Sequence, residues 1–245
     1  MNKKEVLSSI RKRNTASTIY LGLIILLPIF GFFSALGTYR IAVHEPVSIS
    51  LTYFNIILFV ISMVSFLCLR YTHREQAKEK ILLDPYVVPF RPLENQNLDS
   101  ELIRIFDMHK LPNGNYCSFI KRRFDVLYML YHMPSYDHRE FVKEKEKTTR
   151  LARKDARLKE VMPTAKINRT LRVNILLLDT FNEEALKAAS KNASYGMRFA
   201  EGFMTVYIDL ESSKLYIPVL STLESLGGHY TYCVKNLLDM IPGIE

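Results

Sequence analysis

The stretch LRVNILLLD, residues 171 to 179, decides the fold of the C-terminal part of this chain. It is short, almost wholly apolar and rich in branched side chains, which is typical of a strand buried on both faces of a sheet. The next residues, 180 to 192 (TFNEEALKAASKN), predict a short helix capped by Asp179 or Thr180. Residues 203 to 220 (FMTVYIDLESSKLYIPVL) then predict two strands joined at residues 211 to 213.

A last helical region completes this part of the chain. It follows Ser221, is interrupted at Gly227-Gly228 and ends near Pro242. The order is therefore strand, helix, strand, strand, helix. This order predicts a small α/β (α+β) unit over residues 171 to 245, in which helices cover a small sheet.

The residues before this unit, 98 to 170, are expected to form a helical region. Residues 117 to 133 (CSFIKRRFDVLYMLYHM) place their large apolar side chains on one helical face, which predicts a core helix. Their aromatic richness also suits a strand, with Asn113-Gly114 as a hairpin turn, and this alternative stays open.

Two runs in the N-terminal part carry no Asp, Glu, Lys, Arg or His: residues 14 to 39 and residues 46 to 69. The hydrocarbon core of a bilayer requires about 20 such residues per helix. We therefore predict a transmembrane hairpin of two membrane-spanning helices over residues 14 to 69. On this prediction the chain is an integral membrane protein.

Basic residues flank both outer ends of the predicted hairpin. Residues 1 to 13 hold five Lys and Arg against one acid, and four more Lys and Arg fall within residues 70 to 80. Lys and Arg near a span stay on the cytoplasmic side, so a cytoplasmic N-terminus and a cytoplasmic C-terminal domain are expected. Residues 70 to 97 are expected to be a stalk and a Pro-rich linker. For a bacterial source, the location would be the cell inner membrane.

The formal net charge of +8 is unevenly distributed. Residues 121 to 172 hold 15 Lys and Arg against 7 acids, whereas residues 173 to 245 hold 5 against 9. Asp137 and Glu140 stand at the spacing of a capping box before a long polar helix in the basic segment. The residues of that segment predicted to bind a partner or an anionic surface are Lys143, Lys147, Arg150, Arg153, Lys154 and Arg157.

Several partners suit a basic helix of this kind. An acidic protein and anionic lipid both attract exposed cations. Nucleic acid is the weaker alternative, because no aromatic side chains interleave with the basic residues. The plainest interpretation is a solvated helix with ion pairs between successive turns, since acids are interleaved along it.

A second set of residues is the candidate for an active site. The segment HMPSYDHRE supplies His132, Asp137 and His138, and Asp179 ends the buried strand at 171 to 179. Ligands of α/β sheets bind beyond the carboxyl ends of strands, which is where Asp179 is expected. If folding brings these four side chains into one cleft, they could act on a phosphate-containing substrate or on nucleic acid.

The sequence lacks the usual catalytic and cofactor motifs. It has no GxxxxGK[ST], GxGxxG or GxSxG pattern, and its three cysteines include no CxxC pair. We therefore expect no cofactor, no metal and no catalytic residues. The preferred hypothesis is a membrane-anchored docking or scaffold subunit, which binds other proteins or itself, in an envelope complex such as secretion or conjugation machinery. The alternative is a membrane-tethered enzyme that uses the four candidate residues.

Overall fold

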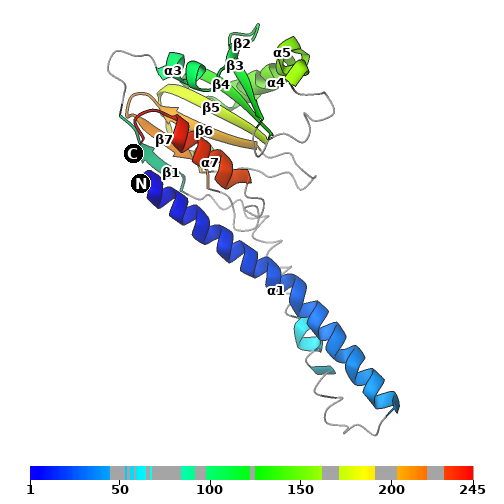
Figure 1. Cartoon of the computed structure of the whole chain (residues 1–245). Helices are drawn as coiled ribbons and strands as arrows, with labels where there is room; N and C mark the ends of the chain where they lie inside the picture. The colour runs from blue at the N-terminus through cyan, green and yellow to red at the C-terminus, as the bar shows by residue number, and fades with distance from the viewer. Residues whose placement is uncertain are drawn as a thin grey trace. The chain divides into compact units, whose positions relative to one another are not determined.

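The computed structural model describes most of the chain (Figure 1). The described residues are 1–44, 53, 56–57, 59–64, 67, 84–91, 98–121, 125–161, 171–190, 203–219 and 229–244. They fall into two compact units, of which the first comprises Met1–Arg13 with Leu82–Glu245 and the second comprises Asn14–Ile81. The helix α1 (Lys3–His44) begins in the first unit and continues into the second.

The first unit is built on a single mixed sheet with the strand order β1-β7-β6-β5-β4-β3-β2. Its three central strands are parallel, and the outer strands on both sides run antiparallel to their neighbours. The strands are β1 (Tyr86–Pro89), β2 (His109–Lys110), β3 (Tyr116–Lys121), β4 (Asp125–Ser135), β5 (Leu171–Thr180), β6 (Phe203–Asp209) and β7 (Lys214–Ile217).

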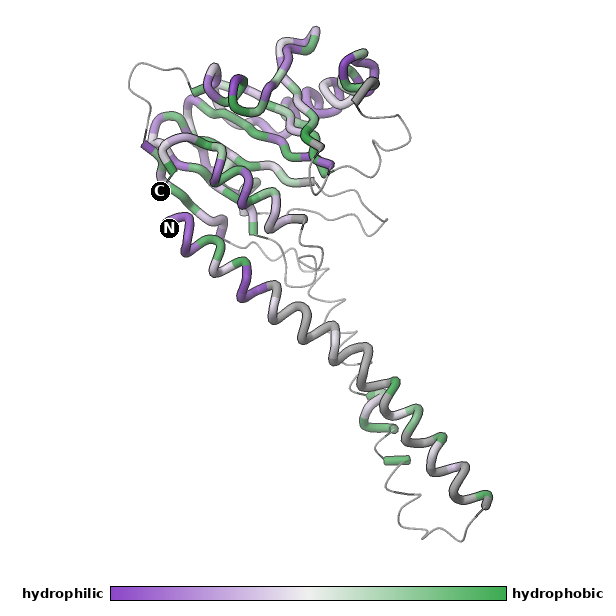
Figure 2. The backbone as a smooth tube through the Cα atoms, viewed as in Figure 1, coloured by the Kyte–Doolittle hydropathy of each residue, from purple (hydrophilic) through white to green (hydrophobic). Residues whose placement is uncertain are grey.

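The central strand β5 is buried from Leu171 to Leu178, because helices cover both faces of the sheet. Parallel strands need long crossovers, and these are helical: α4 (His138–Lys154) and α5 (Ala156–Val161) link β4 to β5, and α6 (Glu183–Ala189) links β5 to β6. Figure 2 shows largely apolar colours along the central strands and polar colours along α4. The sequence therefore predicted the buried strand at 171 to 179 correctly.

Two hydrophobic cores lie on opposite faces of the sheet. The first core packs α3 (Leu98–Ile105), α7 (His229–Met240) and the start of α1 onto one face, and Val6 and Ile10 of α1 are buried in it. The second core packs α4, α5 and α6 onto the other face (Figure 1). We call these the α3/α7 face and the α4 face.

Residues 117 to 133 do not form the predicted core helix. The described residues of this range, 117–121 and 125–133, belong to β3 and β4, which pair antiparallel, and the turn at Asn113 and Gly114 links β2 to β3. The apolar side chains of β4 fill both cores in alternation: Tyr128 lies in the first core and Tyr131 in the second. A strand that is apolar on both faces also matches a helical repeat, which explains the wrong assignment. The sheet is accordingly larger than the small one predicted.

The predicted transmembrane hairpin is also wrong. Among the residues that the structure describes, no helix combines the length and the apolar character that crossing a bilayer requires. The run 14 to 39 is not an element of its own, because it continues a helix that starts at the charged residue Lys3, and the run 46 to 69 is described only in part. The predictions of an integral membrane protein and of a cell inner membrane location fail with the hairpin.

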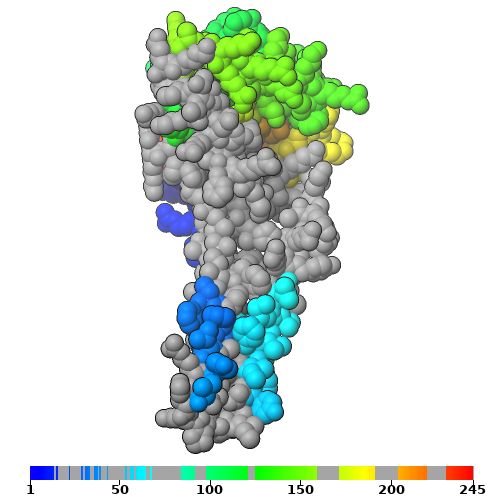
Figure 3. Space-filling model, turned by 90° about the vertical axis from the view of Figure 1, so that its right-hand side faces the viewer, coloured from blue at the N-terminus to red at the C-terminus, as the bar shows by residue number. Residues whose placement is uncertain are grey.

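The second unit contains a close helix contact. A Cβ atom added at Gly31 would lie 3.1 Å from the Cβ of Ser62, which is 8% exposed. Side chains from the two segments adjoin one another in Figure 3, in blue and cyan. The predicted stalk, residues 70 to 84, lies outside the described residues except for Asp84.

Candidate functional site

The basic helix α4 is anchored at its start and along one face. Asp137 caps it, with a side-chain oxygen that accepts a hydrogen bond of 2.8 Å from the backbone N–H of Glu140, so the Asp137 half of the predicted capping box is confirmed. Phe141, Thr148 and Ala152 are buried against the sheet. Their spacing of 7 and 4 residues defines one inward helical face, which leaves the opposite face to solvent.

The opposite face of α4 carries a row of exposed cations. Successive cations of this row are three or four residues apart, so their side chains follow one line along the helix. Arg153 flanks the row and Arg157 lies in α5, and both are exposed as well. The row, which we call the basic face, consists of Arg139, Lys143, Lys147, Arg150 and Lys154.

Acidic side chains do not neutralise the basic face. Lys147 lies 3.7 Å from Glu144, and Arg150 lies 3.9 Å from Glu146. Both distances are near the upper limit for an ion pair and both cations are exposed, so each pair contributes about 1 kcal/mol or less. Glu144 also accepts hydrogen bonds from the side-chain amides of Asn113 and Asn115 in the β2–β3 turn. These bonds draw the Glu144 carboxylate inward.

Lys145 is the cation of α4 that behaves differently. Its ammonium lies over the ring of Phe141, 5.8 Å from the ring centroid. Burial is the main cause that lowers the pKa of Lys145, and repulsion from Arg172 lowers it further. Lys145 therefore belongs to the packed side of the helix and not to the basic face. Figure 3 shows side chains from the region around α4, in green and yellow-green, at the surface of the molecule.

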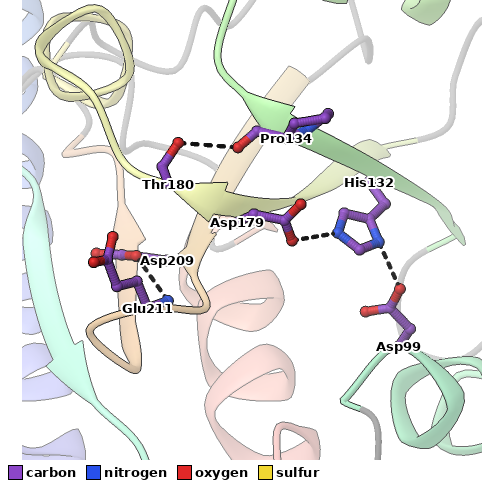
Figure 4. A network of polar contacts seen from close by, with 7 residues as sticks. All are labelled: Asp99, His132, Pro134, Asp179, Thr180, Asp209 and Glu211. Atoms are coloured by element: carbon purple, nitrogen blue, oxygen red, sulfur yellow. Dashed lines mark hydrogen bonds and ion pairs between the residues drawn. The ribbon is translucent and has the colours of Figure 1, made fainter.

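The second candidate site lies at the carboxyl ends of the parallel strands (Figure 4). Nε2 of His132, in β4, lies at hydrogen-bond distance, 2.8 Å, from Oδ1 of Asp179 in β5. Its Nδ1 lies 2.8 Å from Oδ2 of Asp99 in α3. The alternation along the strands places His132 and Asp179 on the α3/α7 face, since Leu130 and Leu177 belong to the core of that face. One imidazole thus joins three elements that are distant in the sequence.

The charge of His132 depends on both carboxylates. Partial burial lowers the pKa of the imidazole, but the hydrogen bond and charge of Asp179 and the charge of Asp99 outweigh burial, so the pKa is raised above 6.5. The His132 and Asp179 side chains are 45% and 53% exposed, whereas Asp99 is 22% exposed. Solvent therefore reaches the ring and Asp179 more readily than Asp99.

The four residues of the predicted active site do not converge. His132 and Asp179 meet, but Asp137 caps α4 and His138 contacts the hydroxyl of Tyr136 at 3.1 Å. Tyr136 is part of the core on the α4 face, the opposite side of the sheet from His132. The single cleft required by the enzyme hypothesis is therefore not formed by these side chains.

Two nearby polar side chains have structural roles. Asn182, and not Asp179 or Thr180, caps α6, by accepting a hydrogen bond of 2.8 Å from the N–H of Ala185. Asp209, at the end of β6, accepts a hydrogen bond from the backbone N–H of Glu211 (Figure 4). It also accepts hydrogen bonds from the backbone N–H and the hydroxyl of Ser212. Asp209 therefore shapes the β6–β7 turn.

Sequence reasoning missed Asp99 as a partner of His132. The available signal was weak: an acid in the first turn of a predicted helix, which the helix dipole alone would explain. It also missed a second cluster, in which Nε2 of His109 lies 3.3 Å from Sγ of Cys117 and 3.2 Å from Asp155. Burial, followed by the charge of Asp155, raises the pKa of Cys117 to about 12, so this thiol stays protonated.

Within the described part of the chain, no three His, Cys, Asp or Glu side chains are arranged to hold a metal ion. Comparison of the chain with protein-family models, with curated proteins and with solved structures gives no match. Function must therefore be argued from the chain's own geometry, above all from the basic face of α4 and the His132 network.

Proposed function

We propose that the chain is a docking subunit that binds an acidic partner protein through the basic face of α4. The observation that carries this proposal is the line of five exposed cations on the side of α4 that faces away from the sheet. Opposite charges across an interface speed up association and select the partner.

The packing of α4 supports a recognition role. Its inward face and its cap fix the helix on the sheet, so the cations stand on a rigid element. Side chains on a rigid helix lose less conformational freedom on binding than those on a loop. A solvated helix without a partner would need only mixed charge, whereas the five cations of the basic face outnumber the three acids of α4, Glu140, Glu144 and Glu146, and the pairs with Glu144 and Glu146 are weak.

A binding titration with a defined probe tests the proposal. Full-length chain is titrated with fluorescent poly-L-glutamate, and a variant carries Lys143→Glu, Lys147→Glu and Arg150→Glu. The control carries Lys110→Glu, Lys187→Glu and Lys214→Glu, three exposed cations on other elements. We expect the first variant to bind roughly tenfold or more weakly, because each lost contact costs up to about 1 kcal/mol. The control should lose much less.

Two results would contradict the proposal. Equal weakening by the two triple variants would show that net charge, and not the basic face, determines binding. Tighter binding to duplex DNA or to anionic lipid vesicles than to poly-L-glutamate at the same salt concentration would identify a different class of partner.

A further inference from the structure

We propose that His132 is a proton-dependent clamp that fixes the first turn of α3 to the carboxyl ends of β4 and β5. The clamp is independent of the docking function, because His132 and the basic face belong to opposite faces of the sheet.

Both ring nitrogens of His132 contact a carboxylate. Each nitrogen lies 2.8 Å from a carboxylate oxygen, one from Asp99 and one from Asp179. A carboxylate only accepts hydrogen bonds, and a neutral imidazole donates only one. Both contacts are therefore satisfied only when the ring carries two protons. Loss of one proton turns one contact into two facing lone pairs.

Deprotonation of His132 releases the contact with Asp99 rather than the contact with Asp179. Asp179 and His132 lie on neighbouring strands, whose pairing holds them in register: His132 faces Leu177, two residues before Asp179. Asp99 comes from α3, a helix whose backbone hydrogen bonds run within the helix and not to a neighbouring strand. Leu102 anchors the rest of α3 in the core, and Phe106, the residue that follows α3, is buried there as well. The effect of deprotonation is thus confined to the first turn, where Leu98 and Asp99 are only half-buried.

The surrounding charges favour the protonated clamp. Asp99 from α3 and Asp179 from β5 face the ring, so two carboxylates stabilise the imidazolium. Glu101 of α3 is paired with Arg104, and Asp209 is bonded within its own turn. Because the folded-state pKa of His132 is raised, the clamp contributes fully below pH 6.5 while both carboxylates stay ionised, and it is lost as pH rises through the raised pKa.

Hydrogen–deuterium exchange of the full chain tests the clamp. Protection factors of the amides of Leu102 and Ile103, whose helical acceptors are the first-turn carbonyls of Leu98 and Asp99, are corrected for intrinsic exchange rates and compared at pH 6 and pH 9. We expect them to fall about two- to fivefold at pH 9, since a partly exposed ion pair contributes less than 1 kcal/mol. In His132→Asn, whose side chain does not titrate, protection should be low at pH 6 and should not change with pH.

Two further variants keep the test decisive. Asp99→Asn should behave like His132→Asn, whereas Glu101→Gln, which removes an acid of the same helix that does not contact His132, should behave like the wild type. In parallel, NMR titration of the His132 ring should give a lower pKa in Asp99→Asn and in Asp179→Asn than in the wild type. Protection that is equal at both pH values in the wild type, or a pH response that persists in His132→Asn, would overturn the proposal.

Discussion

The two faces of the sheet are packed by different means. On β5, the side chains that face α3 and α7 are all apolar from Leu171 to Leu177. The side chains that face α4 alternate with these and include the buried polar residues Arg172 and Asn174. A helix over the α4 face therefore meets polar groups as well as apolar ones, and α4 itself buries Thr148. Because both polar and apolar contacts hold the inner side of α4, the helix can be highly charged on its outer side and still be firmly placed.

One buried cysteine lies in the core on each face of the sheet. Their slow alkylation is the largest effect that we expect. Cys233 lies in the core of the α3/α7 face and Cys117 in that of the α4 face. Burial raises the pKa of both to about 12. In a Cys68→Ser background, alkylation of both by iodoacetamide at pH 8 should be roughly a thousandfold slower than in the urea-unfolded chain, and should speed up as pH rises. Rapid labelling of Cys117 alone would show that the α4 face opens to solvent.

Truncation of one aromatic side chain on each face sharpens the comparison. Phe106, on the α3/α7 face, is fully buried with its ring centroid 4.7 Å from that of Tyr128. Phe106→Ala should lower the free energy of unfolding by about 3–5 kcal/mol. Phe141→Ala, in α4, should cost less, because polar contacts also hold this helix. Urea unfolding measures both, and a larger loss for Phe141→Ala would reverse the comparison.

Among the described residues, two glycines with positive φ give a smaller effect. Gly243, with φ of 76°, lies so close to Arg91 that a Cβ would stand 2.4 Å from the Arg91 carbonyl oxygen. Gly114, with φ of 91°, has open space around it. Gly243→Ala should therefore cost about 2–3 kcal/mol and Gly114→Ala about 1 kcal/mol. Equal shifts in thermal midpoint would show that the C-terminal segment does not pack against Arg91 as described.

The caps of the helices on the α4 face give the smallest effect. Asp137→Ala and Asn182→Ala each remove one side-chain acceptor at a helix start. Each should cost about 1 kcal/mol of unfolding free energy in urea titrations. Asp137→Asn, which keeps an acceptor oxygen, should restore most of the loss. A cost for Asp137→Ala well above that for Asn182→Ala would mean that Asp137 does more than cap α4.

Local sequence signals identified some elements and misassigned others. The buried strand at β5, the turn after β6 and the cap of α4 follow from residues near one another in the chain. β4 was misread because a strand that is apolar on both faces satisfies helical spacing as well. The uncharged run 14 to 39 was misread because composition does not show where a helix begins.

The exposed basic residues were predictable from the sequence, and the His132 network was only partly so. The charge asymmetry identified the basic segment, five of whose six predicted cations lie in α4 while Arg157 lies in α5, and the burial pattern of α4 then orients them. The bonds of His132 to Asp99 and Asp179 span 33 and 47 residues. Only the parallel register of β4 and β5 and the docking of α3 bring them together, and neither is visible in local patterns.

The most direct test of docking through the basic face compares proteins that co-purify with three forms of the chain from the cells that make it. The forms are wild type, Lys143→Glu/Lys147→Glu/Arg150→Glu, and the control Lys110→Glu/Lys187→Glu/Lys214→Glu, quantified by mass spectrometry. We expect an acidic protein to be retained by the wild type and the control and to be lost from the α4 variant. Recovery of the same proteins in the same amounts with all three forms would contradict it.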